Sequence, residues 1–374
     1  MFKRLFCIVI AVLFIFNCYF GSAEPLSVSA KSAVLLNAET LSVYYDKNMN
    51  EKLSMASTTK IMTAVILCEN KRLDEEITVT YEMIAVEGTS MGLREDDKVS
   101  YYALLCGLLL SSGNDAANAI ALSICDNFKD FASMMNKKAK EIGMKNTNFV
   151  TPSGLDSEKH YSSAYDMALL ASYALKIEAI KSIVCQKSIV VEYGSPKVEH
   201  TLHNHNRLLS LYKNAIGFKT GFTKKSGRCL VSAAQKDGEV LIAVTLNAPD
   251  DWDDHILLYE YGFQKFKDYC VSDTVDLNKI SVADVSLNKG DILIEKKTVS
   301  ITDSDKGKIT YKTYIPPFTY ASQNGKKIGE IEYFCNGKYL TTSNVFLNID
   351  TKNEKSKRDY LFEFFYNIKK LLSI

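Results

Sequence analysis

The stretch SMASTTKIMTAV, residues 54–65, places a polar Ser-Thr-Thr-Lys cluster directly before an apolar, helix-prone run. The pattern predicts a helix over Thr58–Asn70. Ser57 and Lys60 are three residues apart at the start of this helix, so their side chains emerge on the same face. A serine hydroxyl becomes an effective nucleophile when a base lies within hydrogen-bond reach, and Lys60 is such a base once burial and nearby positive charge remove its proton. Alone the pattern is weak, because a capping Ser and a solvated Lys also produce it.

A second polar interruption lies in LLLSSGNDAANA, residues 108–119. Ser112, Gly113 and Asn114 separate two apolar helical patterns, which predicts a tight turn that offers a hydroxyl and an amide to a cleft. An ordinary helix N-cap is the alternative, since Ser and Asn are common capping residues.

The third stretch is AIGFKTGFTKKSGRCLVSAA, residues 215–234. If its beginning is a strand, Lys219 and Gly221 point to one side and Thr220 to the other. We expect Lys219 to supply positive charge for a substrate carboxylate. Gly221 lets a substrate backbone lie against the strand edge, because a larger side chain would block its approach.

The periodicity around these motifs predicts an α/β fold, a mixed sheet that carries helices. A strand hairpin is expected from Ser27 to Tyr45. The predicted helices are Thr58–Asn70, Tyr101–Leu110, Asn114–Asn127, Phe128–Ile142 and Ala164–Ala174. The predicted later strands are Ser188–Tyr193, Ala215–Thr220, Arg228–Lys236 and Val240–Leu246.

The character of the chain changes after Cys270. Short β-rich runs follow, and Asn324-Gly325 and Asn336-Gly337 between them are typical of hairpin turns, because both turn residues tolerate positive φ. We therefore expect a catalytic domain over residues 24–270 and a small all-β sandwich over residues 271–350.

The two ends suggest export and membrane contact. Lys3 and Arg4, an apolar run over Leu5–Phe16 and small residues before Glu24 predict a signal peptide over residues 1–23. Residues 351–374 predict a linker and a basic amphipathic helix, which suits the surface of an anionic membrane. Packing of this helix on its own protein is the alternative. The expected location is the outer face of the cytoplasmic membrane.

The composition is that of a folded chain without a nucleic-acid partner. Of 374 residues, 47% are hydrophobic and 24% charged, enough for a large core and two domains. The formal net charge is only +1, which argues against nucleic-acid binding.

The three motifs gain weight as a set. Ser-x-x-Lys, Ser-x-Asn and Lys-Thr-Gly in this order are typical of penicillin-binding proteins and class A β-lactamases. The surrounding ASTTKIMTA, SSGNDAANAIA, NTNFVTPSGLD and GFKTGFTKKSGRCLVSAA resemble the low-molecular-mass penicillin-binding D-alanyl-D-alanine carboxypeptidases over roughly residues 27–270. The resemblance implies a β-lactamase-like catalytic domain: an antiparallel sheet with helices on both faces and a helical subdomain.

The resemblance also implies a reaction. Ser57 attacks the D-Ala-D-Ala bond of a peptidoglycan stem peptide, Lys60 takes its proton, and water hydrolyses the acyl-enzyme, so no metal or organic cofactor is expected. β-Lactam antibiotics should acylate the same serine. The remaining site residues are assigned as follows: Ser112 as proton relay, Asn114 as a peptide ligand, Lys219, Thr220 and Gly221 as substrate-binding residues, and the backbone N–H groups of Ser57 and Phe222 as the oxyanion hole.

Several alternatives remain open at this stage. A peptidoglycan endopeptidase uses the same site on cross-links, a β-lactamase commonly adds a Glu such as Glu158 to position water, and a wall-binding scaffold needs no intact site. Relatives often place an Arg near the substrate carboxylate, and His205, Arg207 and Arg228 are the candidates for that place here.

Overall fold

The computed structural model describes residues 26–275, 277, 279–282, 290–303 and 305–349. The expected signal peptide and the expected amphipathic helix lie outside these ranges. Within them, no helix combines the length and the apolar character needed to cross a bilayer.

A five-stranded antiparallel sheet forms the centre of the larger part, in the order β2-β1-β9-β8-β7. Its strands are β1 (Ser32–Asn37), β2 (Val43–Lys47), β7 (Ala215–Thr223), β8 (Gly227–Lys236) and β9 (Glu239–Leu246). The predicted hairpin and later strands are confirmed, and β7 runs beyond the expected Thr220. Because β7 is the last strand of the sheet, one of its edges has no strand partner within the described part of the chain.

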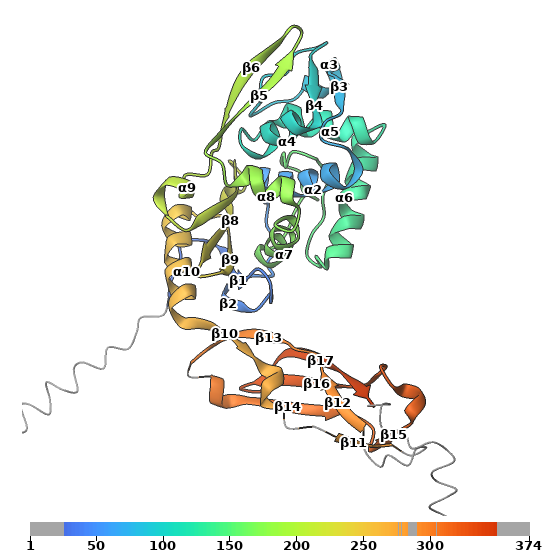
Figure 1. Cartoon of the computed structure of the whole chain (residues 1–374). Coiled ribbons are helices and arrows are strands. Elements are labelled where there is room, and N and C mark those ends of the chain that lie inside the picture. Colours follow the sequence, from blue (N-terminus) through green and yellow to red (C-terminus); the bar gives the residue numbers. More distant parts are fainter. Residues whose placement is uncertain (1–25, 276, 278, 283–289, 304, 350–374) are drawn as a thin grey trace, which may run out of the picture.

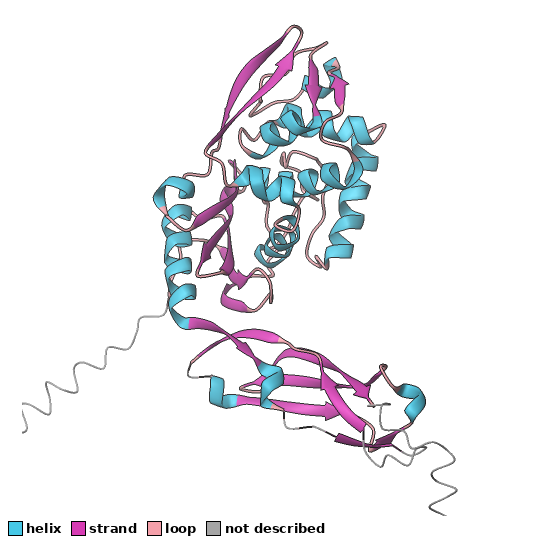
Figure 2. Ribbon diagram, viewed as in Figure 1, coloured by secondary structure: helices cyan, strands magenta, loops and turns pink. Residues whose placement is uncertain are grey.

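Helices cover both faces of this sheet (Figures 1 and 2). Alternate residues of β1 divide between two apolar clusters, Val34 and Leu36 on one face and Ala33 and Leu35 on the other. On the first face α7 (Ala164–Ala174) packs on β1 and β9, and on the second α10 (Asp251–Lys265) packs on β8 and β9. The predicted antiparallel sheet between helical layers is confirmed.

A helical subdomain lies beside the sheet. Its helices are α2 (Lys60–Asn70), α3 (Tyr81–Ile84), α4 (Tyr101–Leu109), α5 (Asn114–Ile124), α6 (Phe128–Ile142) and α8 (Glu178–Val184). The prediction for α5 was three residues too long, because Cys125 is already extended. A second sheet in the order β3-β4-β5-β6 borders these helices, with β3 (Glu76–Thr78), β4 (Lys98–Ser100), β5 (Ser188–Gly194) and β6 (Lys197–His203).

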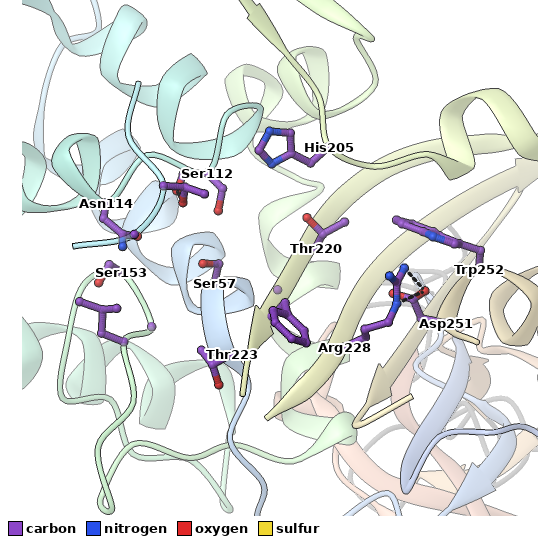
Figure 3. Close-up of a pocket in the computed structure, with 16 residues that line it drawn as sticks. Ser57, Ser112, Asn114, Ser153, His205, Thr220, Thr223, Arg228, Asp251 and Trp252 are labelled. Carbon is purple, nitrogen blue, oxygen red and sulfur yellow. Dashed lines mark hydrogen bonds and ion pairs between the residues drawn. The ribbon is translucent and has the colours of Figure 1, made fainter. Parts of the chain in front are cut away.

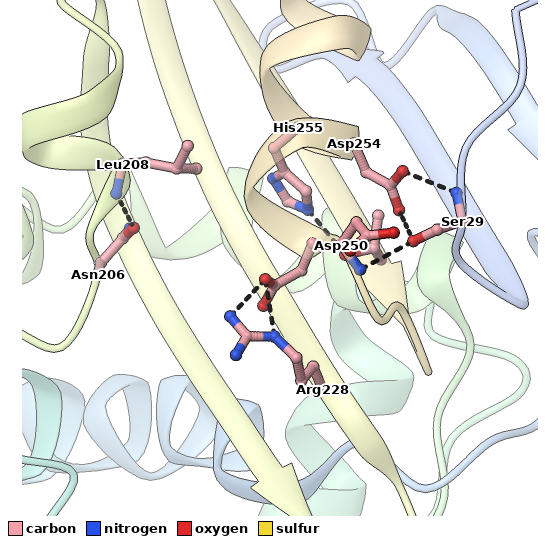
Figure 4. A network of polar contacts seen from close by, with 9 residues as sticks. Ser29, Asn206, Leu208, Arg228, Asp250, Asp254 and His255 are labelled. Carbon is pink, nitrogen blue, oxygen red and sulfur yellow. Dashed lines mark hydrogen bonds and ion pairs between the residues drawn. The ribbon is translucent and has the colours of Figure 1, made fainter.

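α10 is tied to the start of the described chain (Figure 4). The Asp254 carboxylate accepts hydrogen bonds from Ser29 N at 2.7 Å, Ser29 Oγ at 2.8 Å and Ala30 N at 3.1 Å. The three hydrogen bonds of Asp254 fix α10 against the sheet, where the first residues of the helix reach the site described below. A short helix, α9 (Leu208–Leu211), lies before β7.

The last part of the described chain is built of strands. A six-stranded sheet has the order β14-β16-β17-β12-β11-β15, and β10 pairs with β13. The strands are β10 (Phe266–Cys270), β11 (Lys279–Val282), β12 (Gly290–Ile294), β13 (Thr298–Thr302), β14 (Ile309–Tyr314), β15 (Phe318–Thr319), β16 (Lys327–Cys335) and β17 (Lys338–Asn348). Asn336 and Gly337 join β16 to β17 with φ of 51° and 77°, as predicted. Asn324-Gly325 does not join two paired strands and lies before β16.

Candidate active site

Ser57 and Lys60 meet at the junction of two helices. Ser57 belongs to a short 3-10 helix, η1 (Ala56–Thr59), and Lys60 is the first residue of α2. Lys60 Nζ lies 3.0 Å from Ser57 Oγ, within hydrogen-bond reach. The three-residue spacing therefore places the two side chains together, as the sequence predicts.

The Lys60 side chain is fully buried, and among the described residues no carboxylate is a hydrogen-bond partner of its Nζ. It donates to Asn114 Oδ1 and to the carbonyl oxygen of Ser153, each at 2.7 Å. Burial lowers the pKa of Lys60 well below its ordinary value, the positive charge of Lys219 lowers it further, and Asp115 opposes the shift. Lys60 is thus held where its neutral form is favoured.

The Ser112–Asn114 segment forms the predicted tight turn between α4 and α5. Ser112 has a φ of 58°, and Asn114 is the first residue of α5. The Asn114 amide is oriented from both ends, because its Oδ1 accepts from Lys60 while its Nδ2 donates to Glu87 O at 2.6 Å. The turn therefore brings Ser112 and Asn114 to the same place as Ser57.

Strand β7 supplies the opposite wall. Lys219 is 1% exposed, its Nζ donates to Thr220 O at 3.0 Å, and burial lowers its pKa to about 7. Thr220 faces the other way, toward the cleft. Gly221 also has a packing role that the sequence did not indicate, because a Cβ at this position would lie 3.0 Å from Ser57 N and 3.1 Å from Met55 O. Gly221 makes room for the segment that contains Ser57, and its expected role toward a substrate stays a prediction.

These elements enclose a cleft of about 410 Å³. Figure 3 shows Ser57, Ser112, Asn114 and Ser153 on one side and Thr220, Arg228 and Trp252 on the other. The lining residues are Ser57, Gly88, Thr89, Ser112, Asn114, Ser153, Gly154, Leu155, His205, Thr220, Gly221, Phe222, Thr223, Arg228, Asp251 and Trp252. Segments from seven separate parts of the chain therefore meet around Ser57.

Two of the three candidate cations for a substrate carboxylate line this cleft. His205 and Arg228 do so, whereas Arg207 lines a different pocket. The Arg228 guanidinium donates to Asp251 Oδ1 from Nη2 at 2.6 Å and from Nε at 2.9 Å, and it lies 5.3 Å from the ring centre of Trp252. Arg228 thus forms an ion pair and also faces the cleft.

Comparison with known proteins identifies the family. The profile of the D-alanyl-D-alanine carboxypeptidase family of peptidases matches residues 20–250. The chain belongs to this family. It is 34% identical over 287 residues to the D-alanyl-D-alanine carboxypeptidase DacF of Bacillus subtilis. The aligned region covers 75% of this chain and 72% of the relative.

Other members extend the likeness. The crystal structure of penicillin-binding protein 5 from Haemophilus influenzae superposes with a TM-score of 0.76 at 25% identity and covers 88% of this chain and 99% of that protein. A D-alanyl-D-alanine endopeptidase of Escherichia coli is 28% identical over 235 residues, which is 61% of this chain and 74% of the relative. The D-alanyl-D-alanine carboxypeptidase fold, including its β domain, is therefore shared along most of the described chain.

In this member of the D-alanyl-D-alanine carboxypeptidase family, the loop before α7 contributes contacts that the motifs did not reveal. Ser153 binds Lys60 through its backbone, which no side-chain pattern reports. Gly154 has a φ of 89°, and a Cβ there would lie 2.0 Å from Ala56 O. The sequence around Ser153 and Gly154 indicated the family, but it did not predict the contacts that these two residues make.

His160 links the same loop to η1, the 3-10 helix that contains Ser57. Its Nδ1 accepts from Val150 N at 2.9 Å, so the proton of the neutral ring is on Nε2, which donates to Thr59 Oγ1 at 2.8 Å. Thr59 Oγ1 donates in turn to Ala56 O at 2.8 Å. Burial lowers the pKa of His160 to about 4, which keeps the ring neutral.

Proposed function

We propose that the protein is a serine D-alanyl-D-alanine carboxypeptidase that removes the terminal D-alanine of peptidoglycan stem peptides through an acyl-enzyme at Ser57. The observation that carries the proposal is the 3.0 Å contact between Ser57 Oγ and a buried Lys60 whose pKa is lowered. A neutral amine has two N–H bonds and one lone pair. Asn114 Oδ1 and Ser153 O accept the two N–H bonds, which leaves the lone pair for the Ser57 hydroxyl.

In the acylation step, Ser57 Oγ bonds to the carbonyl carbon of the penultimate D-alanine while Lys60 Nζ accepts the hydroxyl proton. The negative charge that develops on the carbonyl oxygen needs donors that are already in place. We assign the backbone N–H groups of Ser57 and Phe222 to this role. The close packing of Gly221 on Ser57 N supports the assignment, because it brings the β7 backbone beside that N–H.

Departure of the leaving group completes acylation. The peptide C–N bond breaks, and the leaving D-alanine nitrogen takes a proton that we assign to Ser112, with Lys60 as its source. Water then attacks the ester carbonyl while Lys60 accepts a proton of that water, and Lys60 returns the proton to Ser57 Oγ as the bond between Oγ and the acyl carbon breaks. Every atom is accounted for by peptide and water, and Asn114 holds the peptide beside Ser57.

Recognition of the free carboxylate is assigned to the β7 side of the cleft. We assign Lys219 to this carboxylate as a cation although burial lowers its pKa to about 7, because a nearby anion stabilises the charged form. The Thr220 hydroxyl gives a donor that faces the cleft. Arg228 adds a second cation from β8, and it is the better candidate than His205, because burial and the charge of Lys219 lower the pKa of His205 and keep its ring neutral. A substrate that ends in a carboxylate therefore meets charge where its scissile bond faces Ser57.

The alternatives have less support. An endopeptidase that acts on cross-links is the second candidate, because one relative carries that name. For a β-lactamase, the proposed Glu158 is exposed and does not line the cleft, and the cleft carboxylate Asp251 is paired with Arg228. A non-catalytic scaffold would have no use for the contact between Ser57 and the buried Lys60.

Location and domain division are proposed from the sequence. The basic and apolar start supports export with cleavage after Ala23, and the amphipathic pattern near the other end supports attachment to the membrane surface. We propose domains over residues 24–270 and 271–350. Deletion of residues 357–374 should release the protein from membranes with full activity, and persistent attachment would reject the anchor.

The decisive experiment combines two readouts on the mature protein. Intact-protein mass is followed after mixing with penicillin, and D-alanine release is measured from an acyl-D-Ala-D-Ala peptide, both also for Ser57→Ala. A lasting adduct and D-alanine release, both absent in the variant, are expected. Rapid loss of the adduct without peptide cleavage would indicate a β-lactamase, and neither signal would reject catalysis at this site.

A further inference from the structure

A buried carboxylate outside the three motifs holds one wall of the cleft. Asp115, the second residue of α5, is 2% exposed. Its Oδ1 accepts from Met91 N at 2.9 Å, and its Oδ2 accepts from Gly92 N and Leu93 N, each at 3.1 Å. The Ser90 hydroxyl donates to the same Oδ2 at 2.5 Å. One carboxylate thus binds four consecutive residues of a loop that has no regular secondary structure.

The same loop forms contacts with the Ser112–Asn114 turn. The Asn114 side chain donates to Glu87 O at 2.6 Å, and its backbone N–H donates to Thr89 O at 2.7 Å. Thr89 Oγ1 donates to Ser112 O at 2.6 Å. The loop of residues 87–93 therefore fixes Asn114 and Ser112 from the side opposite to Lys60.

Strand β5 holds the loop at one further point. The buried Tyr193 hydroxyl donates to Met91 O at 2.5 Å, so Met91 is bound through both its N–H and its carbonyl. Gly113 leaves the space this requires, since a Cβ there would lie 2.6 Å from Asp115 Oδ1 and 3.0 Å from Met91 N. Most of the hydrogen bonds on Ser90–Leu93 nevertheless end on Asp115.

We propose that Asp115 is a positioning residue, which holds the loop of residues 87–93 and through it orients the Asn114 amide so that Oδ1 faces Lys60. If the loop were released, Asn114 Nδ2 would lose its acceptor, and the amide could turn its donor end to Lys60. Lys60 would then lose the acceptor that directs its lone pair to Ser57. The inference rests on the proposed function for its effect on catalysis, but not for its effect on the loop.

Asp115 also acts on Lys60 through its charge. Among the described residues, the charged groups that shift Lys60 are Lys219 of β7, which lowers its pKa, and Asp115 of α5, which raises it. The hydrogen-bond partners of Lys60, the Asn114 side chain and the Ser153 carbonyl, do not titrate. Loss of the Asp115 charge therefore moves the acid limb of the activity profile to lower pH, which a purely structural residue would not do.

The test compares Asp115→Asn with Asp97→Asn in the mature protein. Asp97 is a suitable control, because it is also buried and accepts a backbone N–H bond, from Arg94 at 2.8 Å, but binds neither the loop nor Lys60. Hydrogen exchange of the Met91, Gly92 and Leu93 amides is measured by mass spectrometry. We expect at least a tenfold faster exchange, confined to this loop, in Asp115→Asn alone. Unchanged exchange, or an increase that Asp97→Asn shares, would overturn the proposal.

Activity is measured on the same proteins as penicillin acylation across pH. Asp115→Asn is expected to acylate about tenfold more slowly at its optimum, with its acid limb at lower pH than in the wild type. Wild-type acylation with fast loop exchange would reject the link to Asn114. If Asp115→Asn fails to fold, Ser90→Ala replaces it, because this variant removes one donor from the Asp115 carboxylate. Ser90→Ala should show a smaller increase in hydrogen exchange of the loop, and the acid limb of its acylation profile should stay at the wild-type pH. A wild type that forms no adduct would reject the proposed function, whereas the exchange result would still decide the loop.

Discussion

Burial lowers the pKa of Lys60 of α2, and Lys219 of β7, a strand on the other side of the cleft, lowers it further. Both side chains are buried. A buried cation disfavours a second positive charge nearby, so Lys219 helps to keep Lys60 in the neutral form that a base requires. Lys219 therefore acts on the charge state of Lys60, in addition to the carboxylate-binding role that we propose for it.

This coupling predicts a pH effect of Lys219→Met. Without the Lys219 charge the pKa of Lys60 rises, and the acid limb of penicillin acylation should move to higher pH, in addition to any loss of overall rate. The profile is measured from the second-order acylation rate between pH 4 and 9. Lys225→Met, which removes an exposed lysine from the turn after β7, should leave the limb in place. A limb that stays fixed in Lys219→Met would contradict the coupling.

His160 predicts a loss of stability in acid. Its pKa of about 4 in the folded protein lies below the ordinary value, so the unfolded chain binds an extra proton between roughly pH 6.5 and 4. Stability is full above this window and falls as pH decreases through it, by about 2.5 kcal/mol at pH 4.5 from this group.

Urea unfolding at pH 7 and pH 4.5 tests the contribution of His160. His160→Gln, which does not titrate, should lose less stability between the two conditions than the wild type does, even though it is less stable at pH 7. His255 is a second buried histidine with a lowered pKa, and it contributes equally to both proteins. An identical pH dependence in both would argue against a neutral His160.

Two glycines with the same φ of 89° separate backbone strain from steric conflict. Gly154 lies against Ala56 O, whereas a Cβ on Gly238 would meet nothing within 4 Å. Gly238→Ala should cost about 1 kcal/mol of unfolding free energy, from positive φ alone. Gly154→Ala should cost about 3 kcal/mol more and slow acylation at least tenfold, because the backbone that carries Ser57 must shift. Similar losses of stability for the two variants in urea unfolding would show that the contact with Ala56 is unimportant.

Arg228→Gln should weaken binding of the peptide rather than its cleavage. The variant loses the second cation that we propose for the substrate carboxylate, so we expect KM to rise about tenfold, which corresponds to about 1.4 kcal/mol, with a smaller change in kcat. A peptide whose C-terminal carboxylate is replaced by an amide serves as the control, and its KM should be equal for both proteins. A rise in KM for both peptides would point to a displaced Asp251 instead.

The parts of the site that lie close together in sequence were predictable. The spacing of Ser57 and Lys60 on one helix face, and the alternation of Lys219 and Thr220 along a strand, both follow from the regular geometry of these elements. The central strands were also predictable, because β8 and β9 are apolar runs that end in turn residues.

Other parts depend on contacts that residue patterns do not encode. The Ser153 acceptor is a backbone carbonyl, and any residue type carries one. Asp115 follows Asn114 in a helix start where an acidic residue is common, so its bonds to a distant loop gave no separate signal. The helix that begins at Asp251 was not predicted, because its acidic first turn masks the apolar face that packs on the sheet.

The three oxygens around Lys60 come from η1, α5 and the loop before α7. The oxygen from α5 belongs to a residue 54 positions from Lys60 in the sequence, and the oxygen from the loop to a residue 93 positions away. Until these segments meet, Lys60 is an ordinary protonated lysine in water, and Ser57 is no more reactive than free serine. A newly made chain is therefore chemically silent toward peptides and β-lactams until its tertiary structure is complete. If the proposed function holds, reactivity with penicillin is consequently a direct reporter of correct folding in this protein.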